Sequence, residues 1–173
     1  MNENAVWTIG RAKEEDFEAL HRIELAAFRT LLSAGAVTGL PEATGKEGFA
    51  NYLQQGLLLS AIDAHAQPIG FGAALVMSDT LHICEMDVHP DWQRRGIGRA
   101  LIQRLLEEGR GLGLAQATLT TDRYAPFNAP FYARQGFQIV RGDEPPYFLT
   151  RILAEEAAKG LDPERRVAMA RPL

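Results

Sequence analysis

The sequence has a single cysteine, Cys84, so no disulfide can form within the chain. It contains no apolar run near the roughly 20 residues that a membrane-spanning helix needs, and its first residues lack the pattern of a secretory signal peptide. Basic residues are not in excess, because 18 Lys and Arg face 22 Asp and Glu. This balance argues against nucleic acid or an anionic membrane as the main partner. We therefore expect a cytoplasmic protein that binds neither.

What remains is the composition of an ordinary globular protein. The chain has 173 residues, of which 46% are hydrophobic and 23% charged, and that length is enough to bury a sizeable core. We find no internal repeat, linker or low-complexity segment. We therefore expect one domain over residues 1–173.

The pattern of apolar residues predicts strands that alternate with helices. Alternating and continuous apolar runs predict strands at 5–10, 57–63, 68–77, 80–88, 116–122 and 136–142, and a last short strand within 162–173. Helical spacing predicts helices at 13–29, 49–56, 99–110, 129–135 and 147–160. Neighbouring strands come first and alternating helices and strands follow. This order favours an α/β (α+β) fold with a mixed, mostly antiparallel central sheet and flanking helices.

A glycine-containing turn follows the strand at 80–88, in the stretch QRRGIGRA at residues 93–100. The first N–H groups of a helix have no partner inside it and carry partial positive charge, so a phosphate is a natural ligand there. Gly96 and Gly98 let a ligand approach the backbone closely, and Arg94, Arg95 and Arg99 add positive charge. The stretch predicts a diphosphate site; a tight turn with solvated arginines is the alternative.

Two common nucleotide motifs do not fit this turn. A P-loop requires Lys and Ser or Thr after its last glycine, and neither is present. A dinucleotide-binding turn has a third glycine where this chain has Leu101. Asp122, at the end of the next predicted strand, could serve as the ribose-binding acid, so a dinucleotide-dependent oxidoreductase stays open as a weaker alternative.

Two motifs in order carry a resemblance to a known family. VHPDWQRRGIGRAL (88–101) resembles the central motif of the GNAT superfamily of acyl-CoA N-acyltransferases, and NAPFYARQGF (128–137) resembles the motif that follows it. The resemblance implies a GNAT-like fold with its cofactor motifs in residues 81–137. It further implies direct transfer of an acetyl group from acetyl-CoA, as cosubstrate, to a primary amine, with no metal and with homodimers frequent among members.

The resemblance also implies roles for particular residues. The backbone of Met86, Asp87 and Val88 would hold the pantetheine arm. The pyrophosphate would be bound by Arg94, Arg95, Gly96, Ile97, Gly98 and Arg99. Asn128 would contact the cofactor, although the family often has its asparagine where this chain has Ala125. Tyr132 would lie near the thioester sulfur and Glu85 near the acceptor amine.

Acyl transfer requires a neutral amine, a polarised carbonyl and a protonated or stabilised leaving thiolate. Glu85 is the first candidate for the base and Tyr132 for the acid; an ion pair and aromatic packing are their structural alternatives. Strict alternation puts Asp87 on the face of Glu85. The same alternation puts His82, Cys84, Met86 and Val88 on the other face, and a β-bulge would exchange the faces locally.

Three further side chains have both a chemical and a structural interpretation. His21 and Glu24 lie one turn apart on the first helix and could reach the acceptor, or they could be a solvated pair. Cys84 could form an acyl-cysteine intermediate, but a lone cysteine within a strand is usually inert core.

The C-terminal region, residues 145–173, adds a helix and a strand where the family often has a loop beside the acceptor. The acceptor amine is therefore not specified by the sequence. A CoA-binding sensor or regulatory module without efficient turnover is the alternative function.

Overall fold

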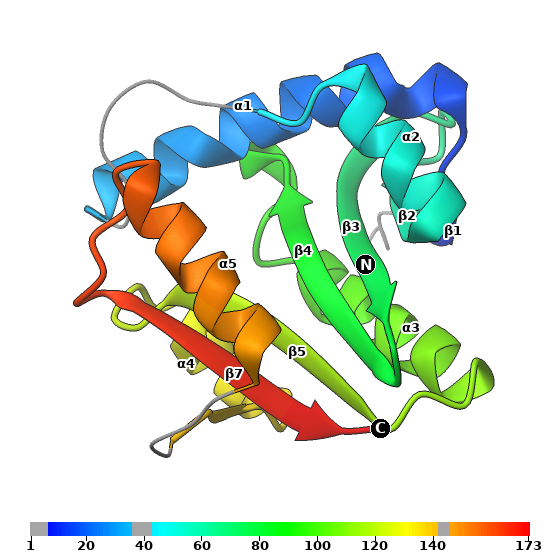
Figure 1. Cartoon of the computed structure of the whole chain (residues 1–173). Helices are drawn as coiled ribbons and strands as arrows, with labels where there is room; N and C mark the ends of the chain where they lie inside the picture. Colours follow the sequence, from blue (N-terminus) through cyan, green and yellow to red (C-terminus); the bar gives the residue numbers. More distant parts are fainter. Residues whose placement is uncertain (1–6, 36–42, 142–145) are drawn as a thin grey trace.

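The computed structural model describes residues 7–35, 43–141 and 146–173. Seven strands form one sheet in the order β1-β2-β3-β4-β5-β7-β6. The strands are β1 (Thr8–Arg11), β2 (Gly56–Ile62), β3 (Pro68–Met77), β4 (Thr80–Val88), β5 (Gln116–Asp122), β6 (Gln138–Ile139) and β7 (Arg166–Pro172). The helices are α1 (Phe17–Ser33), α2 (Lys46–Gln55), α3 (Ile97–Gly111), α4 (Ala129–Arg134) and α5 (Tyr147–Ala158), with short 3-10 turns at Glu14–Asp16 and Pro90–Trp92 (Figure 1).

One pair of strands differs from all the others in direction. The strands β4 and β5 are parallel, and each of the other five neighbouring pairs is antiparallel. The parallel pair is joined by α3, as a crossover between parallel strands requires. The expected mixed, mostly antiparallel sheet is thus confirmed.

Helices cover both faces of the sheet. On one face α3 contributes an apolar stripe that includes Leu101 and Leu105, and Ala129 at the start of α4 joins the same core. On the other face Phe17 of α1 and Phe49 of α2 pack with Phe71 of β3. The helix α5 lies on this second face beside β5 and β7 (Figure 1).

Most expected elements are present with small changes in their ends. The strands β4 and β5 begin and end at the expected residues, and α5 and β7 fall within the expected C-terminal addition. The first strand runs from Thr8 to Arg11, and positions 5 and 6 of the expected strand lie outside the described residues. The strand expected at 136–142 is two residues long, Gln138–Ile139, because the turn after α4, with Gly136 at φ +87°, occupies its start; position 142 lies outside the described residues.

No helix in the described ranges is both long and apolar enough to cross a membrane.

Candidate active site

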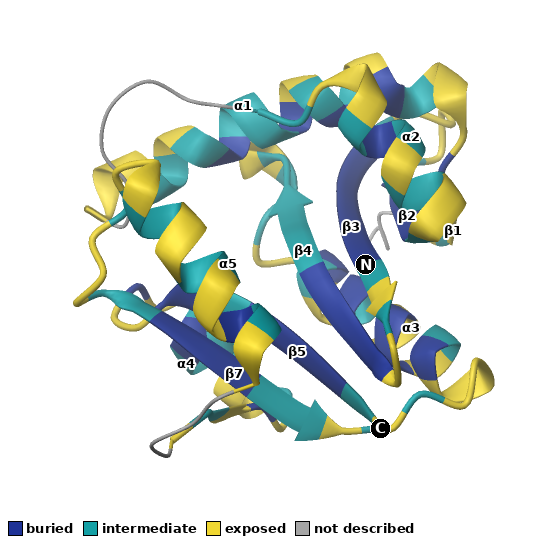
Figure 2. Cartoon of the chain, in the orientation of Figure 1, coloured by how far each residue is buried: buried dark blue, intermediate teal, exposed yellow. Residues whose placement is uncertain are grey.

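The strands β4 and β5 pair over only part of their length. Thr80–Ile83 of β4 pairs with Gln116–Leu119 of β5, and the later residues of β5 pair only with β7. We call the two ends that do not pair with each other, residues 84–88 of β4 and 120–122 of β5, the fork. Figure 1 shows the two strands separating here, and Figure 2 shows β4 changing from buried to partly exposed. The fork leaves one edge of β4 without a neighbouring strand in the described structure.

A β-bulge at Cys84 determines which side chains face the site. Ile83 pairs with Ala74 and Glu85 with Ala73, so Cys84 is the extra residue. After the bulge, Glu85 and Asp87 lie opposite Ala73 and Phe71, on the face covered by α1.

The bulge corrects part of the expected alternation. Met86 and Val88 pack against the α3 core, away from Glu85 as expected. His82, however, stacks edge-on against Phe148 of α5 and therefore lies on the face of Glu85. The Cys84 thiol contacts Tyr52 of α2 on this same face. The bulge therefore exchanges the two faces of β4 locally, so that side chains before and after it no longer alternate strictly.

Three carboxyl groups interact on the α1 side of the fork. Burial, with an added effect from the charge of Glu24, raises the pKa of Asp87 to about 8. Burial likewise raises the pKa of Glu85 well above its usual range, with added effects from Glu24 and Asp87. Both side chains nevertheless keep part of their surface exposed to solvent. They are therefore partly desolvated acids, which is the environment that enzymes use to prepare a base.

Glu24 is held in place by the chain that leads into α2. It accepts hydrogen bonds from the backbone N and the hydroxyl of Thr44, at 2.9 and 3.2 Å, while His21 Nδ1 lies 2.9 Å from the Thr44 carbonyl. His21 therefore anchors this segment, and of the expected pair only Glu24 acts electrostatically on Glu85 and Asp87.

Tyr132 approaches the same carboxyl groups from α4. Its ring packs against Phe131 and Phe137, with centroids 5.1 and 6.0 Å away. Burial raises the pKa of its phenol above the usual range, and the charges of Asp87 and Glu85 raise it further. The phenol is therefore protonated at neutral pH and able to donate a proton.

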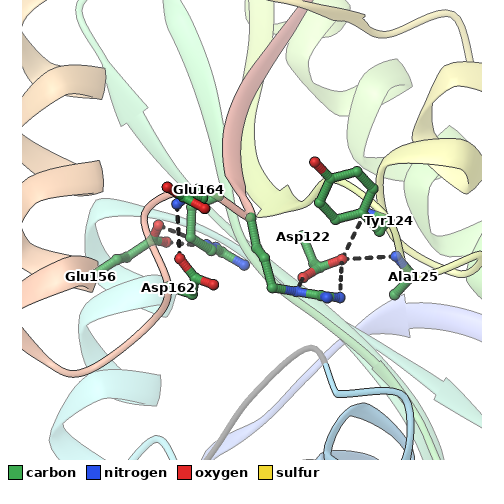
Figure 3. A network of polar contacts seen from close by, with 8 residues as sticks. Asp122, Tyr124, Ala125, Glu156, Asp162 and Glu164 are labelled. Carbon is green, nitrogen blue, oxygen red and sulfur yellow. Dashed lines mark hydrogen bonds and ion pairs between the residues drawn. The ribbon is translucent and has the colours of Figure 1, made fainter.

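Arg166 of β7 is a positive group within electrostatic range of both Glu85 and Tyr132. Its Nε and Nη2 donate to the two carboxylate oxygens of Glu156 at 2.9 and 2.7 Å, and Glu156 also accepts from the Thr120 hydroxyl at 2.6 Å. Because Glu156 belongs to α5, this network ties the extra helix to the fork. Figure 3 shows Glu156 in this region.

The start of α3 has the expected features of an anion site. Gly96 has φ +83° at the N-cap, where no side chain caps the helix, so the first N–H groups of α3 have no intrahelical or capping partner. Arg94 also has positive φ, at 59°. A Cβ placed on Gly98 would lie 3.8 Å from Val88 and 3.9 Å from Phe131, so it would make only ordinary contacts within the chain. Arg95 lies over the ring of Trp92, 4.8 Å from its centroid.

Asn128 immediately precedes α4, and its carbonyl accepts from the Tyr132 N–H at 3.0 Å. Ala125, at the family's usual asparagine position, is buried. Both residues belong to the loop that orients Tyr132.

Asp122 is committed to structure rather than to a ribose. It is fully buried, accepts from the backbone N of Tyr124 and Ala125 at 2.8 and 2.7 Å, and forms an ion pair with Arg165 at 2.7 Å (Figure 3). These bonds hold the loop between β5 and α4. Both carboxylate oxygens of Asp122 therefore already accept hydrogen bonds within the chain, which removes the support for dinucleotide binding.

The structure assigns ordinary structural roles to two other candidates. Burial raises the pKa of the Cys84 thiol to about 12, so it is not a ready nucleophile at neutral pH. Burial lowers the pKa of His82 to about 4, and its Nδ1 lies 2.9 Å from the Thr118 hydroxyl. Both groups are neutral at neutral pH.

Sequence reasoning missed Arg166, Glu156 and Tyr52. Arg166 and Glu156 lie in the C-terminal addition, where no motif distinguishes them from other charged residues. They lie on different elements, α5 and β7, so their spacing in the sequence does not indicate that they form an ion pair.

Comparison with known proteins identifies the family of the chain. The family model for the acetyltransferase (GNAT) domain matches residues 55–139. An amino-acid acetyltransferase of Mycobacterium tuberculosis is 30% identical over 136 residues, which cover 78% of this chain and 70% of that protein. The chain belongs to the GNAT acetyltransferases.

Solved structures share the GNAT fold over nearly the whole chain. The PaiA N-acetyltransferase of Thermoplasma acidophilum, in complex with coenzyme A, has a TM-score of 0.76 at 18% identity and covers 97% of this chain and 99% of its own. The N-acetylglutamate synthase of Neisseria gonorrhoeae, complexed with coenzyme A and N-acetyl-glutamate, has a TM-score of 0.71 at 20% identity and covers 98% of this chain and 35% of its own.

As a GNAT acetyltransferase, the protein transfers an acetyl group from acetyl-CoA to an amine.

Proposed function

We propose that the fork is the place of acetyl transfer and that the acceptor is the amino group of a small amino acid. The observation that carries the proposal is the convergence of Glu85 and Asp87 with Tyr132 and Arg166, which act on one another electrostatically although they come from three separate elements. An acid, a base and a cation at one place provide the groups that this reaction uses.

The cofactor roles follow the shape of the site. The backbone of Met86, Asp87 and Val88 forms the free edge of β4 in the fork, and an extended pantetheine arm fits it as an added strand would. The α3 start, from Arg94 through Gly96 and Gly98 to Arg99, fits the diphosphate, because its N–H groups are uncapped. Asn128 contributes through its backbone, by orienting Tyr132.

Three proton movements accompany the transfer. Glu85, with Asp87 beside it, accepts a proton from the acceptor ammonium, directly or through water, so that the neutral amine attacks the thioester carbonyl carbon. As the new C–N bond forms and the C–S bond breaks, Tyr132 donates its phenolic proton to the leaving thiolate. The nitrogen then loses its second proton, which returns to the Tyr132 phenolate through water, and Glu85 releases its proton to solvent. Raised pKa values of Glu85 and Asp87 suit this role, because a base is most effective when its pKa lies near the working pH.

The charges around the fork support an acceptor with both an ammonium and a carboxylate. In their ionised forms, Glu24, Glu85 and Asp87 attract the ammonium. Arg166 offers its remaining guanidinium donors to a carboxylate, since Nε and Nη2 already bind Glu156. The amino-acid acetyltransferase among the relatives is consistent with this class.

A panel of paired amines tests the acceptor. Release of free CoA thiol is measured with several L-amino acids and with the corresponding decarboxylated amines. We expect amino acids to have the higher kcat/KM. The conservative variant Arg166→Lys should raise KM for amino acids by roughly 10-fold, since it loses a forked hydrogen bond, and should leave KM for the matched amines unchanged. Higher activity with the decarboxylated amines would instead favour a cationic amine without a carboxylate.

The family match supports an acetyltransferase over the alternative of a CoA-binding sensor without efficient turnover. Binding of acetyl-CoA without thiol release, across an amine panel that includes amino acids, would contradict this function.

A further inference from the structure

Glu156, in the last turn of α5, is held in a fixed geometry at the side of the fork (Figure 3). Its two carboxylate oxygens accept from Nε and Nη2 of Arg166 at 2.9 and 2.7 Å, and one of them also accepts from the Thr120 hydroxyl at 2.6 Å. The side chains of Arg166 and Glu156 are only 13% and 18% exposed. Because little water surrounds the pair, its charges are weakly screened.

This ion pair occupies one side of the Arg166 guanidinium and leaves another side for a ligand. A guanidinium has five N–H donors in one plane. Nε and Nη2 bind Glu156, and Nη2 also lies 3.4 Å from the Thr120 hydroxyl. Nη1 makes no hydrogen bond to any residue that the structure describes. The guanidinium therefore has room for one carboxylate of a ligand, at Nη1.

Glu156 also reduces the positive charge that Arg166 presents to the fork. The charge of Arg166 favours the ionised form of Glu85, and the charge of Glu156 acts on Glu85 in the opposite sense. The pair therefore acts on the fork as a partly neutralised cation. One ligand carboxylate is enough to balance what remains of its positive charge.

A second carboxylate on the acceptor would have no cation to pair with. Among the groups in the described part of the chain whose charges act most on Glu85, Arg166 is the one cation and the others are carboxyl groups. The charge of Glu156 also acts on His82, but burial lowers the pKa of His82 to about 4, so its ring is neutral at neutral pH. The segments outside the described ranges contain no Lys, Arg or His. Like charges placed close together weaken binding and so give specificity.

We propose that Glu156 positions Arg166 to receive a single carboxylate, and that its charge restricts the acceptor to amino acids without an acidic side chain. This inference rests on the proposed acetylation of amino acids at the fork. Glu156 contacts no reacting atom; it acts through the orientation and the residual charge of Arg166. Amino acids with a second carboxylate are therefore poor acceptors.

Two pairs of amino acids that differ in charge and hardly in shape test the proposal. They are L-glutamine with L-glutamate and L-asparagine with L-aspartate. Each is added as a competitor of the best amino-acid acceptor, and the acetylated product of that acceptor is measured by mass spectrometry, which does not depend on whether the competitor itself reacts. We expect the neutral member of each pair to inhibit at a concentration about 10-fold or more below that of the acidic member.

Glu156→Gln keeps the shape of the side chain and removes its charge. It should reduce the difference within each pair to about threefold or less, mainly because the acidic members bind more tightly. Unchanged affinity for acetyl-CoA would show that the variant is folded. A purely structural role of Glu156 would weaken both members of a pair equally and leave their ratio unchanged.

Glu155→Gln is the matched control, because Glu155 is the neighbouring residue on α5 and pairs with Arg151 at 3.3 Å on the exposed side of the helix. It should preserve the wild-type difference. In the wild-type protein, equal competition within both pairs, or no competition by any of the four amino acids, would overturn the role of Glu156 alone. A difference that survives Glu156→Gln would overturn it as well. Absence of thiol release with every amino acid would overturn the proposed acceptor class and this inference with it.

Discussion

Tyr132 is a residue whose chemistry can be separated from its packing. Its ring contacts Phe131 and Phe137, and those contacts persist when only the hydroxyl is removed. We predict that Tyr132→Phe lowers kcat by about 100-fold, the lower end of the range for general acid catalysis, because a thiolate is already a fair leaving group. Affinity for acetyl-CoA should change little. Steady-state rates and calorimetry measure both. A wild-type rate, with chemistry shown to limit turnover, would reduce Tyr132 to a packing residue.

Cys84 tests the direct route of transfer. Burial raises the pKa of its thiol to about 12, so only a minute fraction is thiolate at neutral pH. We predict that Cys84→Ala retains most of the turnover and loses some stability from packing against Tyr52. Intact-protein mass spectrometry after incubation with acetyl-CoA should find no acetyl group on Cys84 of the wild-type protein. A trapped adduct on this residue would establish an acyl-cysteine intermediate instead.

Among the elements, the two strands on either side of α3 were predictable and the bulge was not. The strand β4 is rich in apolar residues and stops before Pro90, and β5 is a Thr-rich stretch that stops at the loop after Asp122, so their ends follow from local sequence. The bulge at Cys84 depends on how β3 pairs with β4, a contact between separate elements. The face of His82 therefore could not be predicted from alternation along β4 alone.

The start of α3 offers a steric test of the cofactor site. A Cβ at Gly98 meets only ordinary contacts, 3.8 Å from Val88 and 3.9 Å from Phe131. We predict that Gly98→Val leaves the melting temperature nearly unchanged and weakens acetyl-CoA binding by at least 10-fold, because a branched side chain occupies space beside the N–H groups that bind the diphosphate. Gly96→Val is the contrasting variant. Because φ is +83° at this position and a branched residue disfavours that angle, the substitution should lower the stability of the fold. Unchanged affinity in Gly98→Val would contradict the diphosphate assignment.

The helix α5 is the element that we expect to govern the acceptor. Phe148 packs edge-on against His82 on the face of Glu85, and Glu156 holds Arg166, while Tyr147 is 81% exposed. We predict that substitution of Phe148 or Tyr147 changes the order of preference in an amine panel and leaves acetyl-CoA affinity within about twofold, because α5 lies across the sheet from α3. A changed cofactor affinity with the same amine preference would exclude this division of labour.

The site is built from segments of the chain whose local sequences differ in how clearly they indicate a functional role. Residues 88–101 and 128–137 carry motifs, so the glycine turn and Tyr132, and Glu85 on the strand that leads into the first motif, could be proposed from sequence. Glu24 and Arg166 come from α1 and β7, at opposite ends of the chain, and only the folded sheet brings them toward β4. Each shares its segment with at least one other charged residue, so local sequence does not single it out, and its role follows from long-range packing.

Protonation links the activity of the whole molecule to its stability. The pKa of Asp87 is raised from 3.8 to about 8 in the folded state, chiefly by burial, and that of Glu85 is raised in the same direction. Between pH 4 and pH 8 the folded protein therefore binds more protons at these positions than the unfolded chain does. Stability is fully present below the unfolded pKa and falls as the pH rises through this window, by at most about 1.4 kcal/mol per pH unit for each linked proton.

Activity should change in the opposite direction over the same range. Because the base must be unprotonated to accept a proton, we predict that kcat/KM rises with pH up to about 8 while the free energy of unfolding in urea falls. Asp87→Asn should make the decline in stability shallower without abolishing it, since Glu85 still titrates, and should flatten the rise in kcat/KM near pH 8. Glu47→Gln, at an exposed position on α2, is the control and should reproduce both wild-type profiles. If stability in the wild-type protein rises from pH 5 to pH 8, Asp87 and Glu85 are ionised in the folded state, and the amine must lose its proton to another group or to water.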